Sequence, residues 1–219
     1  YLVLVVRMRQ SDFMPGPVST ARRGPTHLAV LGLFLLLTLL LTYPLVAHFG
    51  THLPGSATWA FDEYTFIWNL WWFKHAIVDL LTSPLHTDLL FFPLGIDLIL
   101  YTFNFFNALI ALPLQLVMSL PAASNFTLVL ATVLSGYGTY LLVRYLLGGA
   151  ARRTISDPWV PHLAAIVAGL VYGFGANRAI YAALGHYDMV TTQWLPFYAL
   201  YLLKTIPVSY THLTLPTKA

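Results

Sequence analysis

Residues 27–47 read HLAVLGLFLLLTLLLTYPLVA and contain no Asp, Glu, Lys or Arg. An α-helix rises about 1.5 Å per residue, so about 20 apolar residues cross a hydrocarbon core of about 30 Å. The run is long enough for this, and we interpret it as the first of several membrane spans. Tyr43 and Pro44 near its end suit an interfacial ring and a tolerated kink.

The composition of the whole chain points to the same class. Of its 219 residues, 58% are hydrophobic and 9% are charged, whereas soluble domains have about 25% charged residues. A soluble core of this length could not bury so much apolar surface. The fold class expected is therefore an all-α membrane protein, a polytopic bundle of transmembrane helices. Because the chain has no cysteine, thiolate nucleophiles and thiolate metal ligands are excluded.

Further apolar runs extend outward from the first. Residues 126–147, 163–183 and 189–204 are predicted spans, and Ala165, Gly169 and Gly173 form a small-residue face suited to close helix packing. Two other segments, 64–81 and 98–120, are either juxtamembrane helices on the outer side or two additional spans. We favour the interfacial alternative, because a span over 64–81 would bury charged side chains at a cost of a few kcal/mol each.

The arginines orient these spans, since Lys and Arg are enriched in cytoplasmic segments. Residues 1–25 hold four arginines and three prolines, which predicts a basic cytoplasmic tail; a signal peptide is the alternative. Arg144, Arg152 and Arg153 follow the run 126–147 and indicate a second cytoplasmic segment. Residues 62 and 188 are then expected on the extracytoplasmic face. Both alternatives for 64–81 and 98–120 preserve this orientation.

The two ends of the sequence suggest a piece of a longer protein. It begins at Tyr1, and residues 208–219, beginning VSYTHL, resemble the translation of a transposase adapter used to build sequencing libraries. We therefore expect residues 26–206 to be the N-terminal part of a transmembrane domain and residues 208–219 to be non-native.

Several polar residues are expected at the outer ends of the spans: Asp62, Glu63, Arg178, His186 and Asp188. A carboxylate can deprotonate or orient a hydroxyl group, and an arginine can bind a phosphate with two parallel hydrogen bonds. A lipid-linked phosphate would lie at this depth, with its tail in the bilayer. These residue types therefore suit transfer of a sugar from a lipid carrier to an acceptor.

The sequence resembles the GT-C superfamily of polytopic membrane glycosyltransferases, especially its YfhO-like and protein-mannosyltransferase-like branches. The resemblance covers about residues 42–204 and is carried by TYP at 42–44, FDEYTFIWNLWW at 61–72, FFPLGIDL at 91–98, SGYGTYLLVRYL at 135–146 and GHYDMVTTQWLPFYALYLL at 185–203.

The resemblance implies roles for individual residues. Asp62 takes the place of the catalytic carboxylate with Glu63 as its neighbour, Asp188 that of the second acidic residue, and Arg178 that of a phosphate-side arginine. His186 is expected to join Arg178 and Asp188 in binding substrate.

The implied partners are a polyprenyl-phosphate sugar donor, membrane lipid and an acceptor that is a glycan, lipid or protein. No nucleic acid partner and no cofactor are indicated, and a divalent cation is left open. The location implied is a bacterial plasma membrane, with the active face outside.

Two other classes compete with this interpretation. A transporter or an envelope-assembly scaffold would need no catalytic carboxylate, although a transporter typically places charges in broken spans near the membrane midplane. A surface-polysaccharide polymerase or ligase would use a similar lipid-linked donor.

Single cysteines introduced into this cysteine-free chain test the predicted orientation. Asp62→Cys should react with a membrane-impermeant thiol reagent in intact cells, whereas Arg152→Cys should react only after permeabilisation, because arginine-rich segments stay cytoplasmic. Labelling of Arg152→Cys from outside would contradict the orientation.

Overall fold

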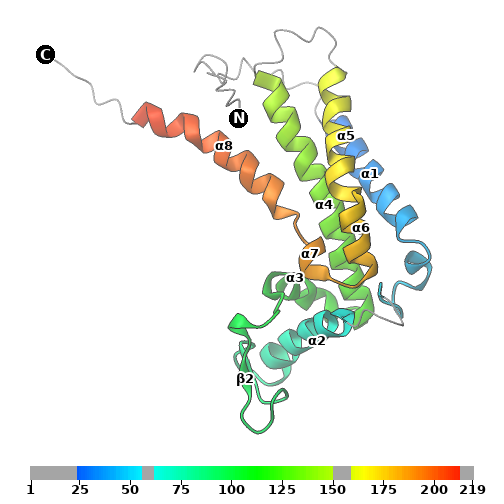
Figure 1. Cartoon of the computed structure of the whole chain (residues 1–219), viewed down its shortest axis with the longest axis vertical. Helices are drawn as coiled ribbons and strands as arrows, with labels where there is room; N and C mark the ends of the chain where they lie inside the picture. The colour runs from blue at the N-terminus through cyan, green and yellow to red at the C-terminus, as the bar shows by residue number, and fades with distance from the viewer. Residues whose placement is uncertain (1–23, 56–61, 150–158, 213–219) are drawn as a thin grey trace, which may run out of the picture. The chain divides into compact units, whose positions relative to one another are not determined.

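A computed structural model describes residues 24–55, 62–149 and 159–212 (Figure 1). Most of these residues are helical, as the sequence predicts. The elements in chain order are α1 (Gly24–Leu41), η2 (Leu45–His48), α2 (Asp62–Lys74), η3 (His75–Asp79), β1 (His86–Thr87), β2 (Ile96–Asp97), η4 (Leu98–Leu100), α3 (Phe105–Gln115), α4 (Leu120–Gly149), α5 (Val160–Phe174), α6 (Ala176–Ala183), α7 (Tyr187–Val190) and α8 (Trp194–His212).

The chain divides into two compact units. The described parts of the first unit are residues 24–34, 134–149, 159–173 and 193–212. Those of the second are residues 35–55, 62–133 and 174–192. Helices α1, α4 and α5 each contribute to both units, and α2, α3, α6 and α7 belong to the second.

Two helical segments are long and apolar enough to cross a membrane, judged by length and composition among the described residues. These segments are Leu120–Gly148 in α4 and Val160–Ala183, which counts α5 and α6 together. The apolar helices His27–Leu41 and Phe105–Gln115 are shorter. The expected small-residue face is confirmed, because Ala165, Gly169 and Gly173 are all buried in α5.

The structure corrects the expected boundaries of the apolar helices. The first helix ends at Leu41 rather than continuing to 47, and residues 45–48 form the separate 3-10 helix η2. Proline removes a backbone donor and disfavours a helical residue before it, which accounts for a break just before Pro44. The expected span 126–147 lies inside α4, which begins earlier, at Leu120.

The early start of α4 has a local cause. Ser119 precedes the helix, and its Oγ accepts a hydrogen bond from the N–H of Ala122 at 3.3 Å, which is an N-cap. Pro121 lies in the first turn, where a missing N–H costs nothing. The segment expected as one unit over 98–120 is therefore η4, an extended connection, the 11-residue helix α3 and the beginning of α4.

The two last expected spans are each interrupted. Residues 163–183 form α5 and α6 with a break at Gly175, whose backbone is extended (φ −60°, ψ 153°). The run 189–204 is divided between α7 and α8, because Thr191 leaves helical geometry (φ −85°, ψ 56°). Glycine and β-branched threonine are weak helix formers, so both breaks fall at positions of low helix propensity.

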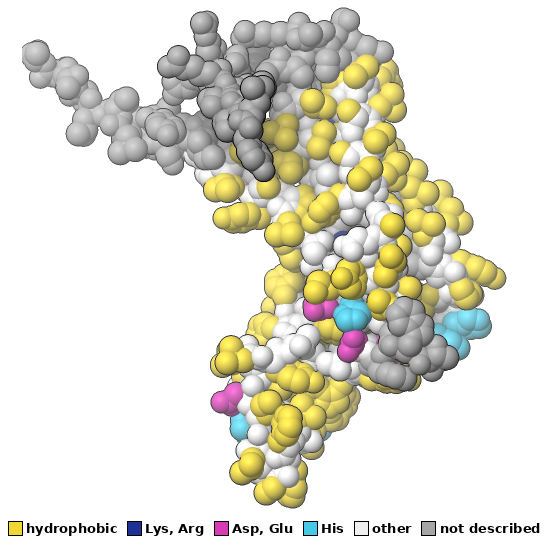
Figure 2. Space-filling model, viewed as in Figure 1, with side chains coloured by type: hydrophobic (Ala, Val, Ile, Leu, Met, Phe, Trp, Pro, Cys, Tyr) yellow, Lys and Arg dark blue, Asp and Glu magenta, His cyan; other side chains and the backbone are white. Residues whose placement is uncertain are grey.

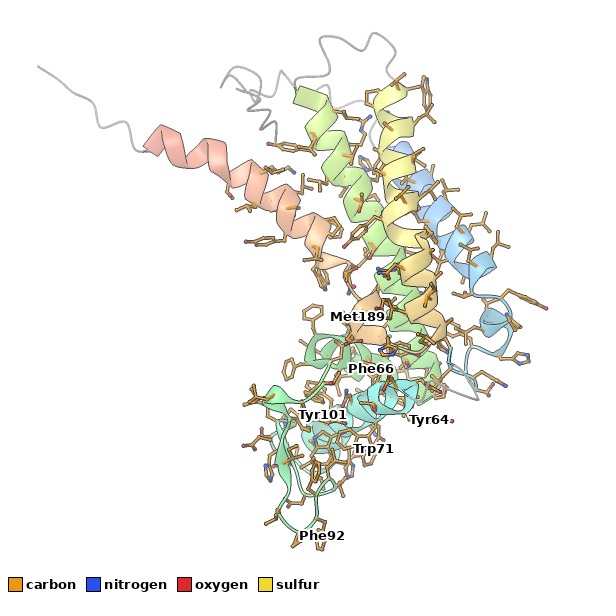
Figure 3. All side chains as sticks on the ribbon, viewed as in Figure 1. Tyr64, Phe66, Trp71, Phe92, Tyr101 and Met189 are labelled. Carbon is orange, nitrogen blue, oxygen red and sulfur yellow. The ribbon has the colours of Figure 1, made fainter. Side chains whose placement is uncertain are left out.

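Helices α2 and α3 pack together in the second unit. Leu70 and Phe73 of α2 form a buried cluster with Ala108 and Ala111 of α3. Gln115 Nε2 also donates to the carbonyl of Leu70 at 3.0 Å. Between these helices the chain forms a short antiparallel hairpin of β1 and β2, and Figure 3 shows Phe92 at its tip. This packing fixes the position of α2, on which the candidate site is built.

Substitution of Gly169 tests the small-residue packing in the first unit. A Cβ at Gly169 would lie 2.6 Å from the carbonyl oxygen of Gly136 and 2.6 Å from Phe34 Cζ. Gly169→Ala should therefore lower the free energy of unfolding by about 1–3 kcal/mol through overpacking, measured by chemical unfolding in detergent micelles. Gly32→Ala is the control, because its Cβ would meet no atom within 4 Å. Equal stability of the two variants would contradict the packing.

Candidate functional site

The acidic pair lies in the first turn of α2. Asp62 and Glu63 are its first two residues. Negative side chains at a helix N-terminus are favoured by the helix dipole and its unpaired N–H groups, which explains why the helix includes them. The two neighbouring carboxylates lie in different environments: Asp62 is exposed and Glu63 is buried.

A helix-ending turn lies against this first turn. After α6, Gly185 adopts a left-handed conformation (φ +74°). The N–H of Gly185 donates to the carbonyl of Ala182 at 3.2 Å, and the N–H of His186 donates to that of Tyr181 at 3.0 Å. These two bonds make a Schellman motif, in which glycine is the preferred residue because it lacks the Cβ penalty. The turn reverses the chain and is followed directly by His186.

The structure brings Asp62 and His186 into direct contact. Nε2 of His186 lies 2.8 Å from Oδ2 of Asp62, with side-chain exposures of 31% and 53%. An ionised carboxylate has no hydrogen to donate, so the imidazole N–H donates to the carboxylate. Figure 2 shows acidic and histidine side chains gathered on the face in view. Two residues separated by more than 120 positions in the chain thus form one polar, solvent-accessible pair.

Glu63 lies between two glycines. It is only 6% exposed, and its side chain packs beside Gly55 while its backbone and Cβ pack beside Gly185. Among the residues that the structure describes, its Oε2 has no hydrogen-bond partner. The carboxyl group of Glu63 is therefore not presented to solvent as that of Asp62 is.

Arg178 and Asp188, also expected at this site, have other contacts. Arg178 is 8% exposed, and its Nη1 donates to Thr192 Oγ1 at 3.0 Å. Asp188 is exposed in the first turn of α7, where its Oδ1 accepts a bond from the N–H of Met189 at 2.9 Å. Both residues belong to the same unit as the Asp62–His186 pair. In the described ranges, no hydrogen bond or ion pair joins either of them to that pair.

Tyr187 is a site residue that sequence reasoning missed. Its ring stacks on Phe66 of α2 with centroids 5.7 Å apart, in a cluster with Leu128 and Val190. Figure 3 labels Phe66 on α2 and Met189 on α7, the element that also carries Tyr187. Burial raises the pKa of Tyr187 to about 12, the Ser124 hydroxyl acts in the opposite direction, and the Glu63 carboxylate adds to the rise. Tyr187 follows His186 directly in the chain, and nothing in this local sequence indicates that its ring packs against Phe66.

The chain before α2 is held by a polar side chain of α4 and by the serine that caps this helix. Asn125 Nδ2 donates to the carbonyls of Phe49 and His52 at 2.8 and 2.7 Å. Ser119 Oγ donates to the carbonyl of Gly50 at 2.7 Å. These three bonds fix the segment that leads toward Asp62. Sequence reasoning also missed this anchor, since Asn and Ser near a helix start are common for other reasons.

The residue types of this arrangement suit proton transfer. An exposed carboxylate paired with an imidazole can accept a proton from a hydroxyl and be held in position while it does so. No group of three or more His, Asp or Glu side chains suited to a metal ion occurs within 24–55, 62–149 and 159–212. The chemistry that these residues offer is thus general base catalysis by Asp62 with His186 as its hydrogen-bond donor.

The burial of Tyr187 predicts a pH dependence of stability. The phenol ionises near pH 10.0 when unfolded and near 12 when folded, so the unfolded state loses its proton first. Stability is unaffected below pH 10.0 and falls as the pH rises toward about 12. Tyr187→Phe should flatten this decline in thermal unfolding measurements, whereas Tyr64→Phe, which alters an exposed ring, should not. An unchanged slope in Tyr187→Phe would contradict the buried phenol.

Comparison with known proteins adds no functional information to the geometry of these residues. No family model, no curated protein and no solved structure matches the chain.

Proposed function

We propose that this chain is part of a membrane glycosyltransferase that moves a sugar from a polyprenyl-phosphate donor to a hydroxyl acceptor at the extracytoplasmic face. The observation that carries the proposal is the 2.8 Å contact between the exposed Asp62 carboxylate and His186. The residue types at this pair, the membrane-length helices of the chain and the resemblance to GT-C enzymes all support it.

The proposed reaction is a displacement at the anomeric carbon of the donor sugar. Asp62 accepts the proton of the acceptor hydroxyl while the hydroxyl oxygen forms a bond to the anomeric carbon. The bond between that carbon and the phosphate oxygen breaks, and its electron pair leaves with the polyprenyl phosphate. The new glycosidic bond replaces the bond to phosphate, so no oxidant or reductant is needed.

The neighbouring residues would divide the remaining tasks. His186 orients the carboxylate by donating its Nε2–H, so that an oxygen of Asp62 faces the acceptor. In this proposal Arg178 keeps its role on the phosphate side of the donor, where the low-dielectric surroundings of a buried guanidinium strengthen its attraction for phosphate. Asp188, exposed on α7, is available to bind sugar hydroxyl groups. Glu63 serves structure rather than proton transfer, because its carboxyl group is buried.

One observation favours a second candidate function. The segment Val160–Ala183 is long and apolar enough to span a membrane, yet its helix is broken at Gly175. Broken membrane helices expose backbone groups that bind substrates and ions in transporters. A transporter would move its substrate across sealed vesicles without forming a glycosidic bond, so product analysis separates the two classes.

Replacement of Asp62 tests the proposed base. Asp62→Asn keeps the shape of the side chain but removes its charge and basicity, so sugar transfer by the full-length protein should fall by about 10²–10⁴-fold. The measurement is transfer of a labelled sugar from a polyprenyl-phosphate donor in membranes, with protein amounts matched. Glu63→Gln should cost less than Asp62→Asn.

The chain offers a matched control for this experiment. Asp79 is also exposed and paired with a histidine, since His75 Nδ1 lies 2.8 Å from its Oδ2, but it lies beyond α2 in η3. Asp79→Asn should leave transfer nearly unchanged. Near-normal transfer by Asp62→Asn, or an equal loss in Asp79→Asn, would contradict the catalytic assignment.

A further inference from the structure

We infer that Gly185 is a positioning residue: its contact with the backbone of Glu63 sets His186 against Asp62. The catalytic use of this pair rests on the proposed function, but the positioning itself is a structural claim and can be tested without activity. Gly185 and Glu63 are each the chain neighbour of one member of the pair. Their contact and the Asp62–His186 contact are therefore two adjacent points where the α6–α7 turn meets α2.

The first reason is steric. A Cβ at Gly185 would lie 2.6 Å from Glu63 Cβ and 3.0 Å from both its Cα and its N. Separations under about 3.0 Å force a shift, and here the atoms that would have to move belong to the first turn of α2 rather than to a flexible side-chain end. Any residue other than glycine must therefore push the turn away from the helix that carries Asp62.

The second reason is conformational. Gly185 has φ +74°, a region that residues with a Cβ rarely adopt. The two hydrogen bonds of the Schellman motif depend on this conformation. If the turn opens, the direction of the chain into His186 changes, and the imidazole loses its contact with the carboxylate even where α6 and α7 remain helical.

The surrounding packing shows why the turn has one position. Tyr187, the next residue, stacks on Phe66 one helical turn further along α2, and Tyr187 N donates to the carbonyl of Gly185 at 3.0 Å. Three consecutive residues after α6 thus contact Glu63, Asp62 and Phe66 in turn. Glycine at the first of these positions allows the backbones to approach closely enough for the other two contacts.

Cross-linking measures this proximity directly, because the chain has no native cysteine. Asp62→Cys and His186→Cys are combined in the otherwise unchanged full chain, and a short bis-methanethiosulfonate reagent joins the two thiols within the membrane. We expect efficient cross-linking in this background. Addition of Gly185→Ala should reduce the cross-linked fraction about tenfold, the scale expected from forcing a left-handed backbone on a residue with a Cβ.

Matched variants separate positioning from general loss of stability. Gly55→Ala also contacts Glu63, but its Cβ would meet the flexible end of that side chain, at 2.7 Å from Cδ and 2.8 Å from Oε1, so cross-linking should be largely kept. Gly95 has a similar backbone (φ +71°) in the β1–β2 hairpin, so Gly95→Ala introduces comparable strain outside the site. It should leave the cross-link intact. Glu63→Gln should do the same, since it keeps the Cβ and the backbone.

Gly185→Asn separates the steric reason from the conformational reason. Asparagine adopts positive φ more readily than alanine, so Gly185→Asn relieves the conformational strain but keeps the clash with Glu63. We expect Gly185→Asn to lose the cross-link as well, because the clash remains, but to a smaller extent than Gly185→Ala, which also carries the conformational cost. Full cross-linking in either Gly185 variant, or an equal loss in Gly95→Ala, would overturn the positioning role.

Sugar transfer gives an independent second measurement, made with Asp62 and His186 intact. Gly185→Ala should lower kcat with little change in the KM for the donor, because the base is misplaced while donor contacts remain. Loss of cross-linking together with an absence of any transferase activity in the unmodified protein would refute the proposed function and leave the positioning role standing. A normal kcat in a variant that has lost the cross-link would show that the positioned pair has no part in transfer.

Discussion

The candidate site depends on the close approach of two backbones, at Gly185 and at Glu63. A helix that ends with a left-handed glycine turns sharply and brings its next residue to a defined place. Here that place is the first turn of α2, whose N-terminus favours negative side chains. The turn and the helix N-terminus thus provide a histidine and a carboxylate 2.8 Å apart, and neither element could do so alone.

The same contact explains why the two adjacent acids differ. Glu63 faces the two glycines and is buried, whereas Asp62, one residue earlier and about 100° around the helix, faces His186 and solvent. Burying a carboxyl group is costly in free energy, and Glu63 is nevertheless buried at the point where its backbone meets that of Gly185. Exposure of Asp62 leaves its oxygens accessible to a substrate hydroxyl. Because the two residues point in different directions from the same helical turn, Glu63 has a structural role and Asp62 is accessible for chemistry.

Composition and periodicity predict the helical class, because apolar runs and small-residue spacing are local properties. Gly169 shows this well, since its packing follows from the spacing of Ala165 and Gly173. The ends of the helices were predicted less well. Pro121 lies before the expected span 126–147 but belongs to the first turn of α4 behind the Ser119 cap, and Gly175 interrupts a run that hydropathy treats as continuous.

The sequence was enough to identify candidate site residues, but it did not predict which of them are in contact. Asp62 and His186 were both expected near one surface, yet their contact depends on the Schellman turn and on the packing of Tyr187 against Phe66. A Leu-Gly pair after a helical run signals such a turn, but nothing in the sequence indicates which helix the turn meets. Arg178 and Asp188 were expected beside the acids. The bond from Met189 to Asp188 is local, whereas the bond from Arg178 to Thr192 joins side chains 14 residues apart and depends on the same turn.

The most direct measurement of the central claim is a double-mutant cycle between Asp62 and His186. The free energy of unfolding is measured in detergent micelles for the unmodified chain, Asp62→Asn, His186→Gln and the double variant. Side chains in direct contact should be non-additive by about 0.5–3 kcal/mol. Additivity within about 0.3–0.5 kcal/mol, the behaviour of independent sites, would contradict the contact on which the account rests.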